Sequence, residues 1–301
     1  MQYLRSFSLA SEADEVDFVL SSASYKLDMA CYSSNNAYPF HIFPKKSFSK
    51  IDFEPITIFY GTNGSGKSTL LNIIAEKLNV SRTAPFNDSP LFAEYLEYCR
   101  YSLCSGQKRL PDESEIITSD GVFDLLLDVR AINSGIDRER EALLEEYANT
   151  LRDSRENGWQ MHDLSEYDEL CRRMEVRKKS RSQYVSKRMS ATTEIPTRSN
   201  GESAFLYFTQ RIGENALYLL DEPENSLSPA LQIELAEFLE AAVRFYGCQL
   251  IISTHSPFLL SIKNAKIYDL DSVPVKAKRW NELENVRAYF EFFKKHETEF
   301  K

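Results

Sequence analysis

A glycine-rich turn between a predicted strand and a predicted helix constrains this chain more than any other feature. Residues 61–68 read GTNGSGKS and fit the pattern GxxxxGKS/T without a mismatch. The apolar run at residues 56–60 predicts a short buried strand before the turn, and the apolar residues spaced along 70–78 predict a helix after it. This context separates a phosphate-binding loop from a chance match. The sequence therefore predicts an α/β fold with the turn at the carboxyl end of a strand.

The residue types of this loop meet the demands of a bound triphosphate. Glycines let the backbone turn so that its N–H groups and the helix N-terminus face phosphate oxygens. Lys67 is expected to neutralise β- and γ-phosphate charge, and Ser68 to place its hydroxyl on Mg²⁺. An ordinary Gly/Ser turn is the alternative. The residues expected to contact the nucleotide here are Gly61, Asn63, Gly64, Ser65, Gly66, Lys67, Ser68 and Thr69.

A downstream pair of acidic residues supplies the second element that ATP hydrolysis requires. Asp221 and Glu222 follow the apolar run at 216–220, which has the length of a buried strand. From the end of that strand, Asp221 can hold Mg²⁺ through water, and Glu222 can reach the water that attacks the γ-phosphate. We therefore expect Ser68 and Asp221 to serve the metal and Glu222 to be catalytic.

The distribution of apolar and polar residues along the chain predicts a single P-loop NTPase domain over residues 1–301 with an insertion. Residues 1–80 and 199–301 have the mixed strand and helix character of a nucleotide-binding core lobe, whereas residues 81–198 are more polar and mainly helical. Residues 229–245 have the spacing of a crossover helix on a parallel sheet. The tail repeats helical spacing after residue 280, and we expect it to dock on the body.

The composition restricts the class of protein, its location and the kinds of cysteine site it can contain. The chain has 36 basic and 45 acidic side chains, a net charge of −9, and 43% hydrophobic residues, as in a globular protein. No apolar run approaches the roughly 18 residues needed to cross a bilayer, and the N-terminus lacks the apolar core of a signal peptide. These observations predict no membrane span and a cytoplasmic location. Five cysteines without a CxxC pair argue against disulfides and a zinc site.

One stretch departs from the overall acidity. A negative chain is unsuited to broad electrostatic capture of nucleic acid, yet residues 172–188 carry eight basic residues against the single acid Glu175. Three interpretations are open for this stretch: contact with nucleic acid, contact with nucleotide phosphates across a dimer, or a solvated helical face.

Four sequence elements, in their order along the chain, resemble those of the ABC-type ATPase family. The P-loop comes first, and Ser199-Asn200-Gly201-Glu202 resembles the signature motif. Residues 221–228, DEPENSLS, resemble a Walker B element running into a D-loop, and His255 within 253–257, STHSP, resembles the switch histidine. Asn200 stands where transporter ATPases usually have Gly, and this D-loop does not end in Asp.

Within that family the chain resembles small stand-alone bacterial predicted ATPases with an AAA_21-type domain, which are similar to the heads of SMC, RecF and OLD proteins. The features that carry this resemblance are Tyr38-Pro39-Phe40, the abbreviated signature and the Asp-Glu-Pro-Glu run. It implies a mostly parallel core sheet with an N-terminal antiparallel β part and an inserted helical lobe. Tyr38 and Phe40 are candidates for stacking on adenine, and Ser119 or Asp120 for the place of the family's Gln-bearing loop.

The resemblance also implies how ATP would act. In this family the signature and the P-loop meet only between subunits, so a head-to-tail homodimer would enclose two ATP·Mg²⁺, with Ser199 and Gly201 of one chain facing the other chain's P-loop. Glu222, His255 and Lys67 would be the catalytic residues. The implied function is an ATP-driven dimerisation switch on a partner protein or nucleic acid, in DNA maintenance or phage defence. The alternatives are a transporter's nucleotide-binding subunit and a non-catalytic ATP-binding module.

Overall fold

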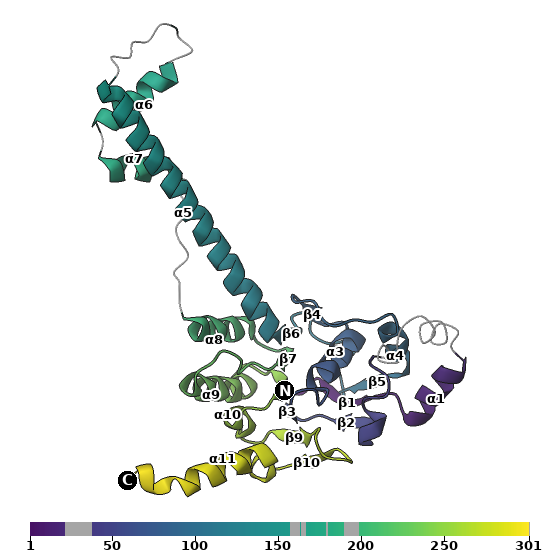
Figure 1. Cartoon of the computed structure of the whole chain (residues 1–301). Helices are drawn as coiled ribbons and strands as arrows, with labels where there is room; N and C mark the ends of the chain where they lie inside the picture. The colour runs from purple at the N-terminus through teal and green to yellow at the C-terminus, as the bar shows by residue number, and fades with distance from the viewer. Residues whose placement is uncertain (22–37, 157–162, 164–166, 179, 190–198, 301) are drawn as a thin grey trace. The chain divides into compact units, whose positions relative to one another are not determined.

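The computed structural model describes residues 1–21, 38–156, 163, 167–178, 180–189 and 199–300. Two compact units divide the chain (Figure 1). The core unit consists of Met1–Phe123 and Ser199–Lys301, and the inserted unit of Asp124–Arg198. Outside the described part lie Cys31, Lys179 and the side chains of Arg177 and Arg181.

A seven-stranded sheet forms the centre of the core unit, in the order β10-β9-β3-β8-β7-β6-β4. Its strands are β3 (Ile56–Tyr60), β4 (Ser81–Arg82), β6 (Glu115–Thr118), β7 (Leu217–Asp221), β8 (Gln249–Thr254), β9 (Lys266–Asp269) and β10 (Lys276–Lys278). All neighbouring pairs are parallel except β9 with β10. Every residue of β3 and β8 is buried, as expected for parallel strands covered on both faces. The predicted mostly parallel sheet is therefore confirmed.

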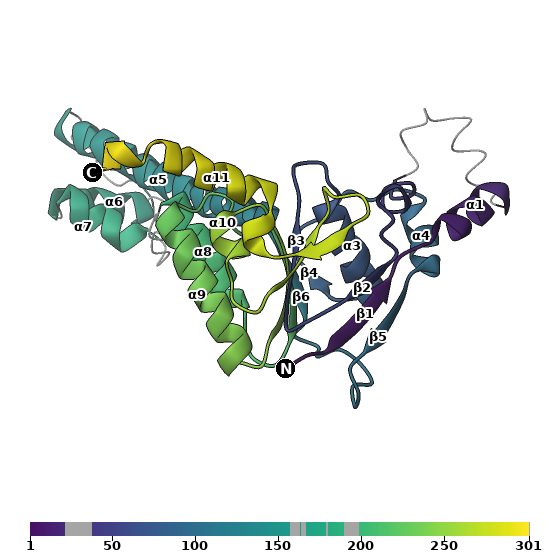
Figure 2. The same ribbon diagram turned by 90° about the horizontal axis from the view of Figure 1, so that it is seen from below.

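Helices cover both faces of this sheet. Figure 2 shows α3 (Lys67–Leu78) on one face and α9 (Pro229–Phe245) on the other. The predicted crossover helix is thus present with the expected bounds, and it buries Leu235 and Leu239 from its apolar stripe. The helices α8 (Asn200–Arg211) and α10 (Pro257–Leu260) both contact α9.

The N-terminal part of the core unit adds a three-stranded antiparallel sheet, in the order β2-β1-β5. Its strands are β1 (Leu4–Ser8), β2 (Lys50–Asp52) and β5 (Arg100–Leu103), and this region also contains α1 (Glu12–Ser21), η1 (Pro44–Lys46) and α4 (Phe92–Tyr98). Aromatic rings fill its core, where Phe40 stacks on Phe18 with 4.4 Å between ring centroids. This sheet confirms the predicted antiparallel β part.

The structure corrects the expected start of the inserted lobe at residue 81. The strands β4 and β6 belong to the seven-stranded sheet, so residues 81–123 lie in the core unit. Both strands are very short, with two residues in β4 and four in β6, so neither leaves a clear pattern in the sequence. The insertion instead starts within α5 (Ser119–Glu156), which follows the carboxyl end of β6 directly.

The inserted unit is built from helices with a small shared core. Besides α5 it contains α6 (Tyr167–Lys178) and α7 (Arg181–Arg188), which pack on each other. The Tyr184 side chain is buried, and its hydroxyl donates a hydrogen bond of 3.1 Å to Glu146 on α5. None of the described helices combines the length and the apolar character needed to cross a membrane.

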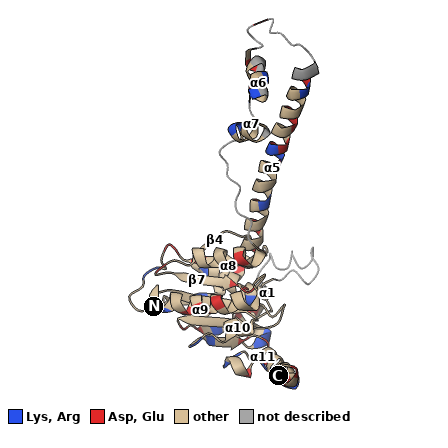
Figure 3. Cartoon of the chain, turned by 90° about the vertical axis from the view of Figure 1, so that its left-hand side faces the viewer, with Lys and Arg blue, Asp and Glu red and all other residues tan. Residues whose placement is uncertain are grey.

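Several basic side chains of the stretch 172–188 hold these helices together. Arg188 lies 3.1 Å from Glu146 and 3.5 Å from Glu175, and Lys187 also pairs with Glu175. Arg172 lies 3.9 Å from Glu146. Figure 3 colours acidic and basic residues on the same helices. These ion pairs give part of the stretch a structural role, while binding of nucleic acid by the remaining basic residues stays a prediction.

Among the described residues of the C-terminal tail, the buried ones lie at its beginning. It comprises η3 (Trp280–Glu282), α11 (Glu284–Lys295) and η4 (Glu297–Phe300). Leu283 and Val286 are buried, whereas Phe290 and Phe293 are 63% and 53% exposed. The expected docking of the whole apolar stripe is therefore wrong beyond its first turn.

Candidate nucleotide-binding site

The three loops predicted to handle ATP follow neighbouring strands. In the sheet, β8 lies between β3 and β7, with Tyr60 opposite Thr254 and Asp221 opposite Ser253. All three strands are parallel, so the P-loop, the switch loop and the Walker B turn start at one edge of the sheet. The carboxyl edge of a parallel sheet is the usual ligand site in open α/β folds.

The P-loop backbone needs glycine at three positions. A Cβ atom on Gly61 would overlap the Ser65 side chain. Gly64 and Gly66 have φ values of +82° and +96°, a region that residues with a Cβ rarely adopt. Gly66 is also the N-cap of α3, so this conformation directs the helix N-terminus into the loop.

Two residues that the sequence did not identify hold this loop from outside. Asp271, just after β9, accepts hydrogen bonds from Thr62, 2.7 Å from the backbone nitrogen and 3.1 Å from the hydroxyl. Lys46 donates to the carbonyl oxygens of Ser65 and Leu270 over 2.7 and 2.6 Å. Burial lowers the pKa of Lys46. Because both residues reach the loop through the tertiary fold, no local pattern could have found them.

Lys67 lies buried in the centre of the loop. Its Nζ donates to the carbonyl oxygens of Gly61 and Thr62 over 3.0 and 3.2 Å. The same amine lies 3.3 Å from Oε1 of Glu222, which is an ion-pair distance. The predicted phosphate-binding cation and the predicted catalytic carboxylate are therefore direct partners.

Asp221 is joined to the P-loop as the sequence predicts. The Ser68 hydroxyl donates to its Oδ1 over 3.1 Å, and the Ser253 hydroxyl donates to the same oxygen. Burial raises the pKa of Asp221 to about 6, against the opposing effect of these two hydrogen bonds. A divalent cation would remove this cost of burying the carboxylate, because it favours the ionised form.

Glu222 is fixed by the turn that follows β7. Its φ is +46°, and its backbone N–H lies 3.1 Å from both the carbonyl and the hydroxyl oxygen of Ser253. Asn225 donates to Oε2 of Glu222 over 3.2 Å and to the Ser119 hydroxyl over 3.3 Å. Ser119, one of the two candidates for the Gln-loop position, is thus two hydrogen bonds from the predicted catalytic carboxylate.

The abbreviated signature forms the N-terminus of α8. Ser199 is its N-cap, accepts a hydrogen bond from the Glu202 N–H, and is exposed. A Cβ on Gly201 would lie 3.0 Å from the carbonyl oxygen of Ser226, which is tighter than most such contacts. Glycine therefore lets the signature pack against the D-loop.

The two aromatic candidates for adenine stacking lie in different environments. Phe40 is buried in the N-terminal core, which removes it from any nucleotide surface. Tyr38 is only partly buried, and its hydroxyl donates to Thr69 on α3 over 3.3 Å. Of the two, only Tyr38 stays a candidate.

The residues present fit a nucleotide phosphate and a magnesium ion. The Ser65 hydroxyl is buried in the P-loop and has no hydrogen-bond partner among the described residues. Such an atom is costly to bury unless a ligand or water completes its bonding. Ser68 and Asp221 offer the oxygen donors that Mg²⁺ prefers.

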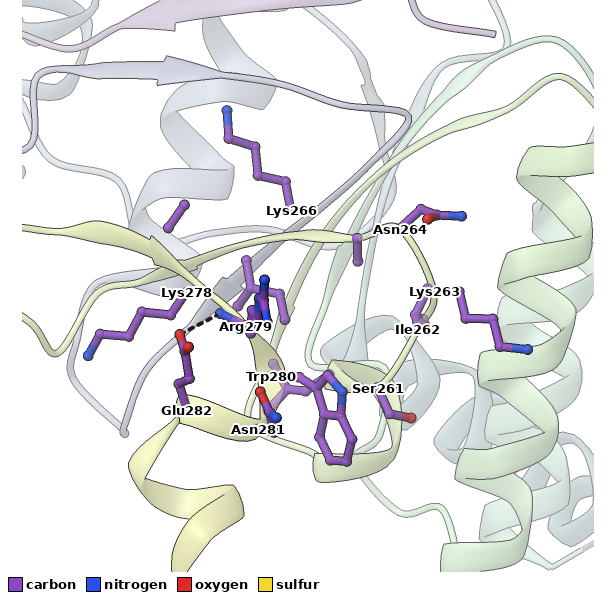
Figure 4. A pocket seen from close by; sticks show the side chains of 14 residues that line it. Ser261, Ile262, Lys263, Asn264, Lys266, Lys278, Arg279, Trp280, Asn281 and Glu282 are labelled. Atoms are coloured by element: carbon purple, nitrogen blue, oxygen red, sulfur yellow. Dashed lines mark hydrogen bonds between the residues drawn. The ribbon is translucent and has the colours of Figure 1, made fainter.

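A separate pocket of about 790 Å³ lies beside β9 and β10 and contains none of these residues (Figure 4). Four of its lining residues are basic: Lys263, Lys266, Lys278 and Arg279. Lys278 lies 2.6 Å from Asp269, and Lys266 donates to the carbonyl oxygen of Asp52 over 2.8 Å. Two of the four cations thus have partners within the protein.

The fold and the strand-end site together define a P-loop ATPase of the ABC type. A family model described as "AAA_21: AAA domain, putative AbiEii toxin, Type IV TA system" matches residues 100–261, or 162 of the 301 residues. The chain belongs to this family, and it therefore carries an ATP-binding ATPase domain. The match contains the signature, Walker B and switch segments, while the P-loop precedes it.

Two solved structures are similar to this chain in fold. One is a putative metal-chelate type ABC transporter in an inward-facing conformation, with 18% identity over 81% of this chain and 82% of that chain, and a TM-score of 0.33. The other is the Smc head domain with an extended coiled coil, bound to the C-terminal domain of ScpA and derived from Pyrococcus furiosus. It has 14% identity over 80% of this chain and 95% of that chain, and a TM-score of 0.37. No curated protein matches the chain.

Proposed function

We propose that this protein hydrolyses ATP with Mg²⁺ and that ATP closes two copies of the chain head to tail. The direct Lys67–Glu222 and Ser68–Asp221 contacts carry the first part of this proposal. They bring the cation, the metal-binding oxygens and the general base of a phosphoryl-transfer site together.

Lys67 and Glu222 exchange partners when nucleotide arrives. Lys67 turns from the Glu222 carboxylate to phosphate oxygens, which offer a larger negative charge. Glu222 is then free to orient a water molecule and accept its proton, with Asn225 holding the other carboxylate oxygen. Mg²⁺ held by Ser68 and Asp221 would neutralise charge on the phosphates.

The signature supports the dimer. The α8 N-terminus and the Ser199 side chain are exposed, and helix N-termini attract anions. A second copy can bring the γ-phosphate of its own ATP to this surface, with Gly201 allowing close approach. Loss of the γ-phosphate then removes a ligand shared by both chains, and the dimer opens.

The output of the switch is an action on a partner protein or a nucleic acid. The inserted unit is suited to transmit changes at the ATP site to the partner, because α5 begins at Ser119, and Asn225 links Ser119 to Glu222. In this proposal, opening and closing of the ATP site reach the partner through that helix.

Phosphate release tests the hydrolytic step. Wild-type protein should release phosphate from ATP only with Mg²⁺, and Glu222→Gln should reduce kcat by about 10² or more while ATP binding persists. Glu234→Gln is the matched control, because Glu234 is exposed on α9. If Glu222→Gln turned over at the wild-type rate, Glu222 would not be the base. If ATP bound without any turnover in wild type, the chain would be a non-catalytic module.

A further inference from the structure

Glu224, two residues after the expected base, is buried beside the switch loop. Its side chain is 4% exposed, and its Oε1 accepts hydrogen bonds from the Thr254 hydroxyl over 2.6 Å and the His255 N–H over 2.9 Å. Oε2 is buried without a hydrogen-bond partner among the described residues. Burial also raises the pKa of this carboxyl. A buried carboxyl group with one unsatisfied oxygen costs folding free energy, so stability alone does not explain its presence here.

This carboxyl group also faces the imidazole of His255. The Nδ1 atom lies 3.2 Å from Oε1 of Glu224, an ion-pair distance when the ring is protonated, although it lacks hydrogen-bond geometry. Nδ1 is buried, while the His255 side chain as a whole is 43% exposed. The exposed surface of this side chain therefore lies on atoms other than Nδ1.

The backbone of His255 is held on both sides. Glu224 accepts from its N–H, and Asn285 of α11 donates to its carbonyl oxygen over 2.9 Å. The backbone N–H of Asn285 in turn lies 3.2 Å from the hydroxyl of Tyr60, the last residue before the P-loop. With the backbone fixed, the remaining freedom of His255 is the orientation of its ring, which the Glu224 carboxylate limits.

We propose that Glu224 is a positioning residue for ATP hydrolysis: it holds Nδ1 of His255 inward and leaves Nε2 to contact the terminal phosphate. This inference rests on the proposed function, because it assigns His255 to the γ-phosphate. Glu224 itself does not touch nucleotide. Coulomb attraction between the Glu224 carboxylate and a protonated ring 3.2 Å away favours the orientation in which Nδ1 faces Glu224.

A double-mutant cycle separates positioning from general support of the fold. Glu224→Gln keeps an acceptor for Thr254 and for the His255 N–H but removes the charge facing Nδ1. We expect kcat to fall about tenfold in the wild-type background and to stay unchanged when the same substitution is added to His255→Ala. Equal losses in both backgrounds, or no loss in wild type, would overturn the proposal.

Nitrogen-15 spectra of histidine-labelled protein supply a readout without turnover. The His255 ring signals, identified by their loss in His255→Ala, should shift in Glu224→Gln and stay in place in Glu234→Gln. Unshifted ring signals in Glu224→Gln would contradict the proposal. If wild type did not hydrolyse ATP, the proposed function would fail as well. If wild type hydrolysed ATP and Glu224→Gln matched it, only the role of Glu224 would fail.

Discussion

At the scale of single residues, a substitution of Lys46 tests how much support of the P-loop backbone contributes to the binding of nucleotide. Its amine holds the Ser65 carbonyl, and a charged hydrogen bond contributes about 1.5–3 kcal/mol. We therefore expect Lys46→Met to weaken ATP binding by roughly tenfold or more, measured by calorimetric titration. Lys45→Met is the control, because Lys45 is the exposed neighbour. Equal ATP affinity in the Lys46→Met and Lys45→Met variants would show that the hydrogen bond from Lys46 to the P-loop does not contribute to ATP binding.

Asp221 should make the stability of the ligand-free protein depend on pH. Its pKa rises from 3.8 to about 6 on folding, so the folded state binds more protons between these values. The free energy of unfolding therefore decreases as pH rises through that window, by at most about 3 kcal/mol.

Denaturant unfolding at pH 4.5 and pH 7.5 measures this effect against Asp221→Asn, whose side chain does not titrate. Raising the pH should destabilise wild type relative to the variant. A difference between the two proteins that stays constant across these pH values would contradict the raised pKa.

Residues in the contiguous motifs were predictable because each motif is local in the sequence. Lys67, Ser68, Asp221 and Glu222 meet as expected, since the ends of three parallel strands determine their neighbourhood. The supporting residues were not predictable in the same way. Lys46 comes from the short helix η1 and Asp271 from the loop after β9, and only the folded chain brings them to the P-loop.

At the scale of elements, Gly201 determines how closely the signature helix approaches the D-loop. We expect Gly201→Ala to cost about 1–3 kcal/mol, because its Cβ would press on the Ser226 carbonyl oxygen. Gly135→Ala on α5 should instead stabilise by up to about 1 kcal/mol, since its Cβ would meet nothing within 4 Å and Ala favours helix.

Local hydrogen exchange in α8 and α5 reports the two Gly substitutions separately. Faster exchange is expected around α8 in Gly201→Ala, and slower exchange around residue 135 in Gly135→Ala. The packing argument would be wrong if α8 were unaffected by Gly201→Ala.

Long elements with a strong pattern were predicted well, and short ones were not. The helix α9 and the buried strands β3 and β7 have apolar runs or regular spacing, which are visible in sequence. The strand β4 has only two residues, so its place at the sheet edge depends on pairing with β6. Because β4 and β6 pair within the core sheet, the insertion starts within α5 and not at residue 81, where the sequence predicted it.

At the scale of the whole molecule, the proposed switch has two states, one with a single chain and one with two chains. In this proposal, nucleotide would join P-loop residues of one chain to Ser199 and Gly201 of another, and hydrolysis would remove the shared phosphate. Blocking the base while keeping ATP should therefore hold the closed state, because Glu222→Gln preserves the side chain's size but cannot accept the proton.

The most direct test is the native mass of wild type and Glu222→Gln, with and without ATP·Mg²⁺. Both should have the 34.7 kDa mass of one chain without nucleotide. With ATP·Mg²⁺, Glu222→Gln should shift to twice that mass, and wild type should return to one chain as phosphate is released. A Glu222→Gln protein that binds ATP but keeps the mass of one chain would contradict the dimerisation switch.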